Sequence, residues 1–148
     1  MTSTNSLELA DNASCAFCAY LRSVRPYTII RRNEQVAVLV TREQRGLPHL
    51  LVLPVRHRET ILDLNDEEAA ALMIGIRQSA LAINTAYQRP GIAVWQNNGV
   101  PANQTINHVH FHIAGTLREG GTEWGDVEEL SVEETDSISD RLSPYLKI

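Results

Sequence analysis

The chain is poor in several features that mark particular classes of protein. Only 5% of its 148 residues are aromatic, so aliphatic side chains must fill most of the core. No apolar run approaches the ~20 residues of a membrane-spanning helix. The opening residues, MTSTNSLELADNAS, lack the basic region and the apolar stretch of a secretory signal. These absences predict a cytoplasmic protein without a membrane partner.

Negative charge is concentrated at the end of the chain. Residues 119–148 contribute −7 to a net charge of −5, so the first 118 residues carry +2. An acidic chain argues against a nucleic-acid partner, because binding to a phosphate backbone depends on an excess of basic side chains. The slightly basic body still suits a small phosphate ligand.

Apolar periodicity predicts hairpin-linked strands around one long helix. The helix begins at Asp66, with Asn65 as its cap, and runs to about Tyr87. A second helix, capped by Ser131, is expected near the end of the chain. Strands are expected near residues 28–31, 35–40, 49–55, 92–97 and 106–114. This order predicts an α+β fold: an antiparallel sheet of about five strands, one long helix and a C-terminal helical tail.

The stretch NHVHFHIAG, residues 107–115, holds three of the five histidines at alternating positions. In a strand, alternate side chains share a face, so His108, His110 and His112 lie roughly 6.5–7 Å apart along one side. Such a row is explained by a polar surface stripe, a metal site or nucleophilic catalysis. At this spacing the three imidazoles cannot easily converge on one metal ion, whose bonds to nitrogen are ~2.0 Å long. Since a neutral imidazole is a good nucleophile near pH 7, the row favours a central nucleophile with two helpers. The residues between the histidines are expected in the core: Val109, Phe111 and Ile113.

HVHFHIA fits the pattern that names the histidine triad (HIT) superfamily of nucleotide hydrolases and transferases. CAFC, LPHLLVLPVRHRETILDL and WQNNGVPANQTINHVHFH also resemble family motifs, so the likeness extends from about Cys15 to Gly115. It implies a HIT-like fold for residues 13–117. A polar tail, residues 1–12, precedes this domain, and an acidic extension, residues 118–148, is expected to pack on it.

The resemblance implies a covalent mechanism and a two-fold homodimer. His110 matches the histidine that attacks the α-phosphate and forms a nucleotidyl-histidine. His112 matches the phosphate-binding neighbour, Gln104 and Thr105 match donors to the phosphate and leaving group, and Asn97 matches a residue that faces the phosphate. The implied substrates are phosphoramidates or dinucleoside polyphosphates. A phosphorylase or transferase that uses phosphate or a sugar phosphate as acceptor is the alternative within the enzyme class.

Two departures from the family pattern concern nucleotide binding. Asn103 replaces a glycine, and asparagine is the best substitute where positive φ is needed. Thr41 stands where the family carries the ribose-binding Asp or Asn, and one hydroxyl makes a weaker contact. These departures leave the nucleoside unspecified and keep open a nucleotide-binding regulatory protein with vestigial activity.

Cys15 and Cys18 have the spacing of a zinc knuckle, and His49 or His57 can supply a further ligand. The resemblance implies a structural zinc site made by Cys15, Cys18, His57 and His108. His108 is thus a candidate for both the catalytic row and the metal. Two reduced cysteines packed in the core are the alternative, and His49 is then either a support for the triad or an ordinary half-buried histidine.

The two tryptophans have different expected places. Trp95 is expected in the core of its strand. Trp124 lies in the more open C-terminal tail, and the resemblance implies that it lines the leaving-group pocket.

Overall fold

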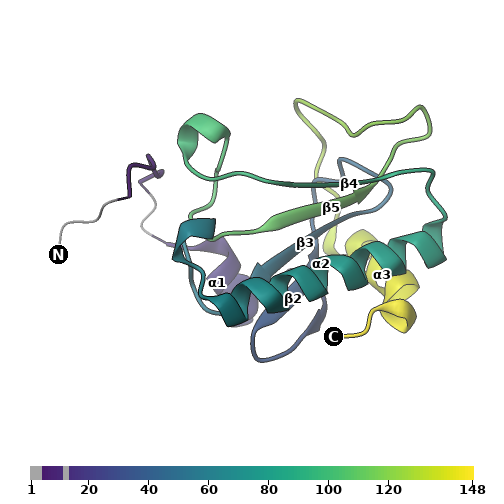
Figure 1. The fold of residues 1–148 in the computed structure, drawn as a ribbon. Helices are drawn as coiled ribbons and strands as arrows, with labels where there is room; N and C mark the ends of the chain where they lie inside the picture. Colours follow the sequence, from purple (N-terminus) through teal and green to yellow (C-terminus); the bar gives the residue numbers. More distant parts are fainter. Residues whose placement is uncertain (1–4, 12–13) are drawn as a thin grey trace.

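One five-stranded antiparallel sheet organises the molecule, with the strand order β1-β2-β3-β5-β4 (Figure 1). The computed structural model describes residues 5–11 and 14–148. The α+β fold with an antiparallel sheet of about five strands is confirmed. The strands are β1 (Ile29–Arg32), β2 (Val36–Val40), β3 (His49–Pro54), β4 (Ile92–Gln96) and β5 (Phe111–Gly115).

The long helix α2 (Asp66–Tyr87) crosses one face of the sheet (Figure 1). Asn65 and Glu68 form a reciprocal capping box at its start, as the sequence predicts for Asn65. Its apolar side, which includes Leu72, Ile76 and Ile83, packs on the aliphatic residues of β2, β3 and β5. This packing removes one whole face of the central strands from water, which is the main stabilising contribution to the fold.

Helix α3 (Val132–Leu142) packs on the same face as α2. Ser131 and Glu134 form its capping box, as predicted. Leu142 and Leu146 are fully buried in the core beside α2. The C-terminal segment is therefore built into the hydrophobic core, although its acidic side chains remain largely exposed.

The short helix α1 (Ala16–Leu21) covers the opposite face of the sheet. Its N-cap is Cys15, whose sulfur accepts a hydrogen bond from the backbone N–H of Cys18. Phe17 and Leu21 pack on a second apolar cluster formed by Ala37, Leu39, Leu51 and Leu53. A helix of six residues has little stability of its own, so α1 depends on this packing.

Strand β5 begins later than the sequence predicts. The expected strand over residues 106–114 starts only at Phe111, because the backbone before it bonds elsewhere. The N–H of His108 donates to the Ile106 carbonyl at 2.8 Å, and that of Val109 donates to the Arg58 carbonyl at 2.7 Å. The predicted alternation of faces is confirmed within the strand: Phe111 and Ile113 contact the α2 core, and His112 lies opposite.

The predicted tail of residues 1–12 lies partly outside the described residues, which omit 1–4 and 12. Its described part runs along the loop between β4 and β5. The Val100 N–H donates to the Glu8 carbonyl at 2.6 Å, and the Asn107 side chain donates to the Ala10 carbonyl. Among the described residues, no helix is long and apolar enough to span a membrane.

Candidate active site and metal centre

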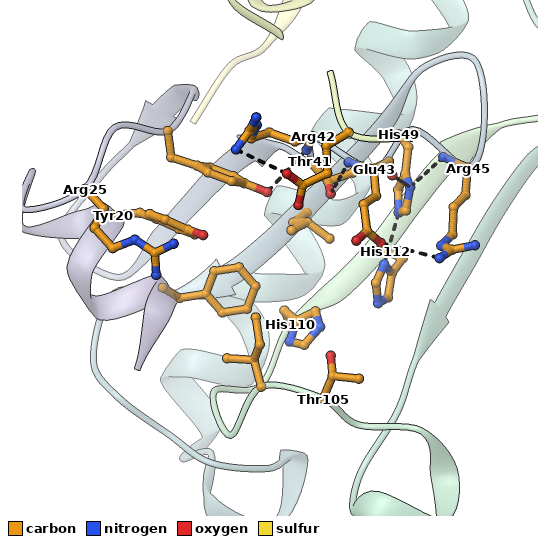
Figure 2. A pocket seen from close by; sticks show the side chains of 15 residues that line it. Tyr20, Arg25, Thr41, Arg42, Glu43, Arg45, His49, Thr105, His110 and His112 are labelled. Carbon is orange, nitrogen blue, oxygen red and sulfur yellow. Dashed lines mark hydrogen bonds and ion pairs between the residues drawn. The ribbon is translucent and has the colours of Figure 1, made fainter. Parts of the chain in front are cut away.

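Two cavities meet at the second and third histidines of the triad. The first has a volume of about 290 Å³ and contains the aromatic rings of Phe17, Tyr20 and Tyr27 (Figure 2). The second has a volume of about 480 Å³ and contains Trp95 and Trp124. The residues common to both linings are Glu43, Arg45, Thr105, His110 and His112. A ligand that spans the two cavities therefore passes directly over His110 and His112.

The ring of His110 is held in one orientation by the backbone carbonyl of His108. Its Nδ1 lies 2.7 Å from the His108 carbonyl oxygen. Because a carbonyl can only accept, Nδ1 carries the proton and Nε2 keeps the lone pair. Burial lowers the pKa of His110, although the hydrogen bond to the His108 carbonyl raises it. The ring packs edge-on against Phe17, with centroids 4.9 Å apart, and against His112 at 5.0 Å.

His112 belongs to a buried stack on the sheet. Its Nδ1 lies 3.0 Å from Nε2 of His49, and its ring stacks on Trp95 at 4.7 Å with an interplanar angle of 4°. Burial is the largest cause that lowers the pKa of His49 to about 4 and that of His112 to about 2. Both rings are therefore neutral at pH 7. His49 contacts the triad through His112, and its expected role as a support stays a prediction.

The expected core position of Trp95 is wrong. Trp95 is directly opposite His112 in the β4–β5 register, and cross-strand partners share a face of the sheet. Its ring consequently lies against the triad and lines the second cavity instead of facing α2. Apolar character alone cannot distinguish the two faces of an edge strand.

Gln104 uses its whole carboxamide to hold the loop. Its Oε1 accepts from the Gly99 N–H at 2.7 Å, and its Nε2 donates to the carbonyls of Glu59 and Ile106 at 2.7 and 3.0 Å. Both donors are occupied by backbone, so a direct bond from Gln104 to a phosphate requires one of these bonds to open. Asn103 has φ of 69°, the left-handed conformation expected at a position where asparagine replaces glycine.

The other predicted nucleotide-binding residues line the cavities. Thr41 is almost buried in the first cavity, and its hydroxyl accepts a bond from the Glu43 N–H at 3.3 Å. Asn97 lines the second cavity and donates from Nδ2 to the Ala102 carbonyl at 2.8 Å. Thr105 is exposed at the junction and borders both.

The C-terminal segment forms a wall of both cavities. Arg45 donates to the Gly125 carbonyl at 2.6 Å and to the Glu123 carbonyl at 3.3 Å, so it holds the residues on both sides of Trp124. Trp124 is 75% exposed, and its ring lies 6.3 Å from that of Trp95. Trp124 lines the second cavity, and its expected place in a leaving-group pocket stays a prediction. The role of Arg45 was not predicted, because its partners are backbone atoms almost 80 residues away.

The four predicted metal ligands come together behind the triad. The ligand atoms of Cys15, Cys18, His57 and His108 all lie within 4.8 Å of one another. Cys15 Sγ is 3.3 Å and Cys18 Sγ 3.7 Å from Nδ1 of His108, and Cys18 Sγ is 3.4 Å from Nδ1 of His57. Tetrahedral Zn²⁺ with its usual bond lengths places sulfur and nitrogen ligands roughly 3.5 Å apart. The cluster therefore fits a zinc ion.

The surroundings of the cluster also suit a metal. The Pro54 carbonyl lies 2.8 Å from Nε2 of His108, so Nε2 donates to it and the Nδ1 lone pair faces the sulfurs. Burial lowers the pKa of His108 to about 4, so the ring is neutral at pH 7, as a metal ligand must be. Burial raises the pKa of the Cys18 thiol to about 11 in the metal-free protein, so metal binding would have to release its proton. His49 bonds to His112 and is absent from the cluster, which distinguishes the two candidates for the third ligand.

The turn that carries His57 is tied to two other parts of the fold. Arg58 bonds to both carboxylate oxygens of Glu68, at 3.0 and 3.1 Å, and so joins the turn to the start of α2. The carbonyls of Arg58 and Glu59 accept bonds from the segment that leads into the triad. Burial raises the pKa of Glu68, but the bonds from Arg58 and the Asn65 backbone lower it by more. The net pKa is therefore below its usual value, and the carboxylate is ionised at pH 7.

Comparisons with known proteins identify the family and agree with the fold. A family model described as HIT domain matches residues 22–119. The adenosine 5'-monophosphoramidase hnt1 of Schizosaccharomyces pombe is 27% identical over 137 residues, covering 90% of this chain and 99% of that protein. The protein hit of Bacillus subtilis is 26% identical, covering 90% of this chain and 94% of that protein.

Solved structures show the same fold. A HIT-like protein from Bartonella henselae superposes with a TM-score of 0.83 at 22% identity, covering 94% of this chain and all (100%) of that one. A Zn-bound histidine triad family protein from Mycobacterium smegmatis has a TM-score of 0.75 at 24% identity, covering 90% of this chain and 93% of that one.

The buried pair His49 and His112 predicts a loss of stability in mild acid. A pKa lowered to about 4 in the fold, against about 6.5 for an unfolded histidine, means that the unfolded chain binds protons first as pH falls. Stability is complete above about pH 6.5 and declines toward pH 4, by about 1–3 kcal/mol for each buried histidine. Urea unfolding at pH 7.5 and 5.0 measures this loss.

The His49→Gln variant is expected to lose less stability between these two pH values than the parent chain, because one buried imidazole is absent. It retains the Cys15–Cys18–His57–His108 cluster, so release of a metal affects both proteins alike. An equal decline in the two proteins would contradict the assignment.

Proposed function

Because the chain belongs to the HIT family, we propose that it is a nucleotide hydrolase or nucleotidyl transferase in which His110 attacks the α-phosphate of a nucleoside phosphate. The observation that supports this most directly is the place of His110. Its ring lies where the two cavities meet, with the proton held on Nδ1 by the His108 carbonyl. The Nε2 lone pair is thus available to a phosphorus atom bound at the junction.

In the proposed first step, Nε2 of His110 forms a bond to the α-phosphorus. The bond from phosphorus to the leaving group breaks, and the leaving group takes the electron pair and a proton from solvent water. Water, or another hydroxyl acceptor, then attacks the phosphorus of the nucleotidyl-histidine and loses its proton to solvent. The bond from phosphorus to nitrogen breaks, and Nε2 of His110 recovers its electron pair. Charge builds up on the equatorial phosphate oxygens, so fixed donors beside them stabilise the transition state.

We assign His112 as one of these donors. His112 donates from Nε2 if its Nδ1 accepts from Nε2 of His49. Nδ1 of His49 lies 3.1 Å from two backbone groups: the Arg45 N–H, which can only donate, and the Glu43 carbonyl, which can only accept. We take the tautomer in which His49 accepts from Arg45 and carries its proton on Nε2, toward His112. The chain Arg45–His49–His112 would then hold one N–H toward the phosphate in a buried, neutral setting.

The two cavities suggest which part of the substrate binds on each side. The first has the aromatic rings for a base and Thr41 for a ribose hydroxyl. The second, with Trp95, Trp124 and Asn97, would take the leaving group. Thr105 stands at the junction beside the phosphate, and Gln104 with Asn103 sets the shape of this loop. Since the S. pombe relative is named an adenosine 5'-monophosphoramidase, adenosine phosphoramidate is the first substrate to test.

Replacement of His110 by Ala is expected to lower kcat by roughly a thousandfold or more, because the covalent route is lost. The assay panel is adenosine phosphoramidate, a dinucleoside polyphosphate and a nucleotide sugar, each with and without inorganic phosphate. Product masses separate a hydrolase from a phosphorylase. Mass spectrometry of the quenched parent enzyme should detect a nucleotidyl adduct on His110. Undiminished turnover by the His110→Ala variant would rule out the mechanism.

We further propose that the Cys15–Cys18–His57–His108 cluster binds one structural Zn²⁺. Four protein ligands complete a tetrahedral shell, so no position remains for a substrate. The bound ion would tie α1 to the segment that leads into the triad.

Elemental analysis of the purified protein is expected to find about one zinc per chain, as a closed four-ligand site requires. The His57→Asn variant should lose most of it. The matched His49→Asn variant should keep it, because His49 bonds to His112. Loss of zinc from the second variant alone would show that the ligand assignment is wrong.

The edge of the sheet supports the expected homodimer. β4 is an edge strand, and its Val94 is half exposed on the side of the sheet that carries α2. Met73 and Leu81 are exposed on α2 itself. Exposed apolar side chains that gather on one side typically mark a protein interface. We propose that two copies associate through this side of the sheet.

Sedimentation velocity at micromolar concentration is expected to give the mass of a dimer. Val94→Arg should shift the mass toward a monomer, because an unpaired charge is costly to bury. Val24→Arg is a matched control, since Val24 is exposed near α1 on the other side of the sheet. A monomer mass for the parent chain would contradict the proposal.

A further inference from the structure

We propose that the metal centre holds two walls of the first cavity, Phe17 and Tyr20, in place, so that metal and nucleotide bind cooperatively. This inference rests on the proposed function, since it assumes that a nucleotide occupies the first cavity. It makes the metal a determinant of nucleotide affinity.

Helix α1 contributes to both sites within six residues. Cys15 caps the helix and Cys18 lies in its first turn, and both sulfurs belong to the metal cluster. Phe17 and Tyr20 alternate with these cysteines and line the first cavity. Any shift of α1 therefore moves two metal ligands and two walls of the nucleotide cavity together.

One ring joins the metal site to the proposed nucleophile. Phe17 packs edge-on against the metal ligand His108, with centroids 5.7 Å apart, and against His110 at 4.9 Å. It is almost completely buried, so it cannot change rotamer without disturbing one of these contacts. The position of Phe17 is thus defined by the metal side of the cavity.

Tyr20 completes the aromatic wall. Its ring stacks on Tyr27 at 4.0 Å with an interplanar angle of 11°, and the Arg25 guanidinium lies 5.3 Å from its centroid. Figure 2 shows Tyr20 and Arg25 side by side at the edge of the cavity. The Tyr27 hydroxyl accepts a bond from the Arg42 N–H at 3.4 Å, which connects this wall to the loop that carries Thr41. An aromatic wall of this kind suits a planar nucleobase.

The metal supplies a constraint that the helix otherwise lacks. α1 is too short to be stable alone, and it is held by Phe17 and Leu21 in the core and by a bond from Arg32 to the Leu21 carbonyl. The other two metal ligands, His57 and His108, come from the turn after β3 and the segment before β5. An ion bound by all four residues would cross-link α1 to the triad. This link would restrict the movement of α1 more than its packing and its hydrogen bond do.

The coupling must act in both directions, because linkage of two binding equilibria is reciprocal. If Zn²⁺ orders the aromatic wall, a nucleotide that packs on that wall must strengthen Zn²⁺ binding by the same factor. Coupling of this type is usually about 5- to 150-fold. We expect a factor of at least about fivefold here.

The experiment measures both affinities with AMP and Zn²⁺ as probes. Calorimetry gives the Kd of AMP for zinc-loaded protein and for protein stripped with a chelator, whose fold is checked by circular dichroism. Competition with a chromophoric chelator gives the Kd of Zn²⁺ with and without saturating AMP. The expected result is AMP binding at least fivefold weaker without zinc, and Zn²⁺ binding stronger with AMP by the same factor.

Two tyrosine variants test the route of the coupling. Tyr20→Ala should bind Zn²⁺ normally in the absence of AMP, but AMP should no longer strengthen Zn²⁺ binding by more than about twofold. Tyr145→Ala is the matched control, since Tyr145 is exposed and lies outside both cavities. It should retain the full factor.

Three results would overturn the inference, and they are distinguishable. Equal AMP affinity with and without zinc would remove the coupling and leave the proposed function intact. If Tyr20→Ala kept the same coupling factor as Tyr145→Ala, the coupling would arise from global unfolding of the metal-free chain and not from the aromatic wall. Absence of AMP binding to either form, with GMP, CMP and UMP equally inert, would refute the inference together with the proposed function.

Discussion

The chain leaves the sheet just before β5, and the site depends on this departure. The Val109 N–H bonds to the carbonyl of Arg58, and the His108 carbonyl accepts from the ring of His110. With these bonds made outside the ladder, His108 is buried toward the cysteines and His110 faces the junction of the cavities. A regular strand would have presented the three imidazoles to the same surroundings.

The third histidine, His112, lies in β5, and residues of the two neighbouring strands surround its ring. β3 supplies His49, and β4 supplies Trp95 directly across from His112. These neighbours desolvate the ring and hold it neutral, which suits a hydrogen-bond donor in a site for anions. One row of histidines thus provides a candidate metal ligand, a proposed nucleophile and its proposed helper, because each residue meets a different part of the fold.

The loop after β2 joins the site to the end of the chain. Arg42 donates to the Leu130 carbonyl at 2.7 Å and pairs with Glu129, while Arg45 holds the backbone around Trp124. The acidic extension is therefore part of the cavity walls, in addition to packing through α3. The partners of both arginines are main-chain carbonyls, which no sequence pattern marks, so the sequence predicts neither contact.

Local patterns in the sequence determined the helix caps at Asn65 and Ser131 and the antiparallel α+β fold. They also marked the cysteines and histidines that are candidate metal ligands. Each depends on spacing, because capping and strand alternation act over a few residues, and the ligand set also followed from family motifs. Only the tertiary structure decided where β5 begins, which face Trp95 occupies, that Gln104 bonds to backbone, and that His49 pairs with His112. The start of β5, the bonds of Gln104 and the His49–His112 pair depend on contacts between segments 45 to 63 residues apart, whose partners no local pattern specifies. The face of Trp95 depends on its pairing with His112 on the neighbouring strand.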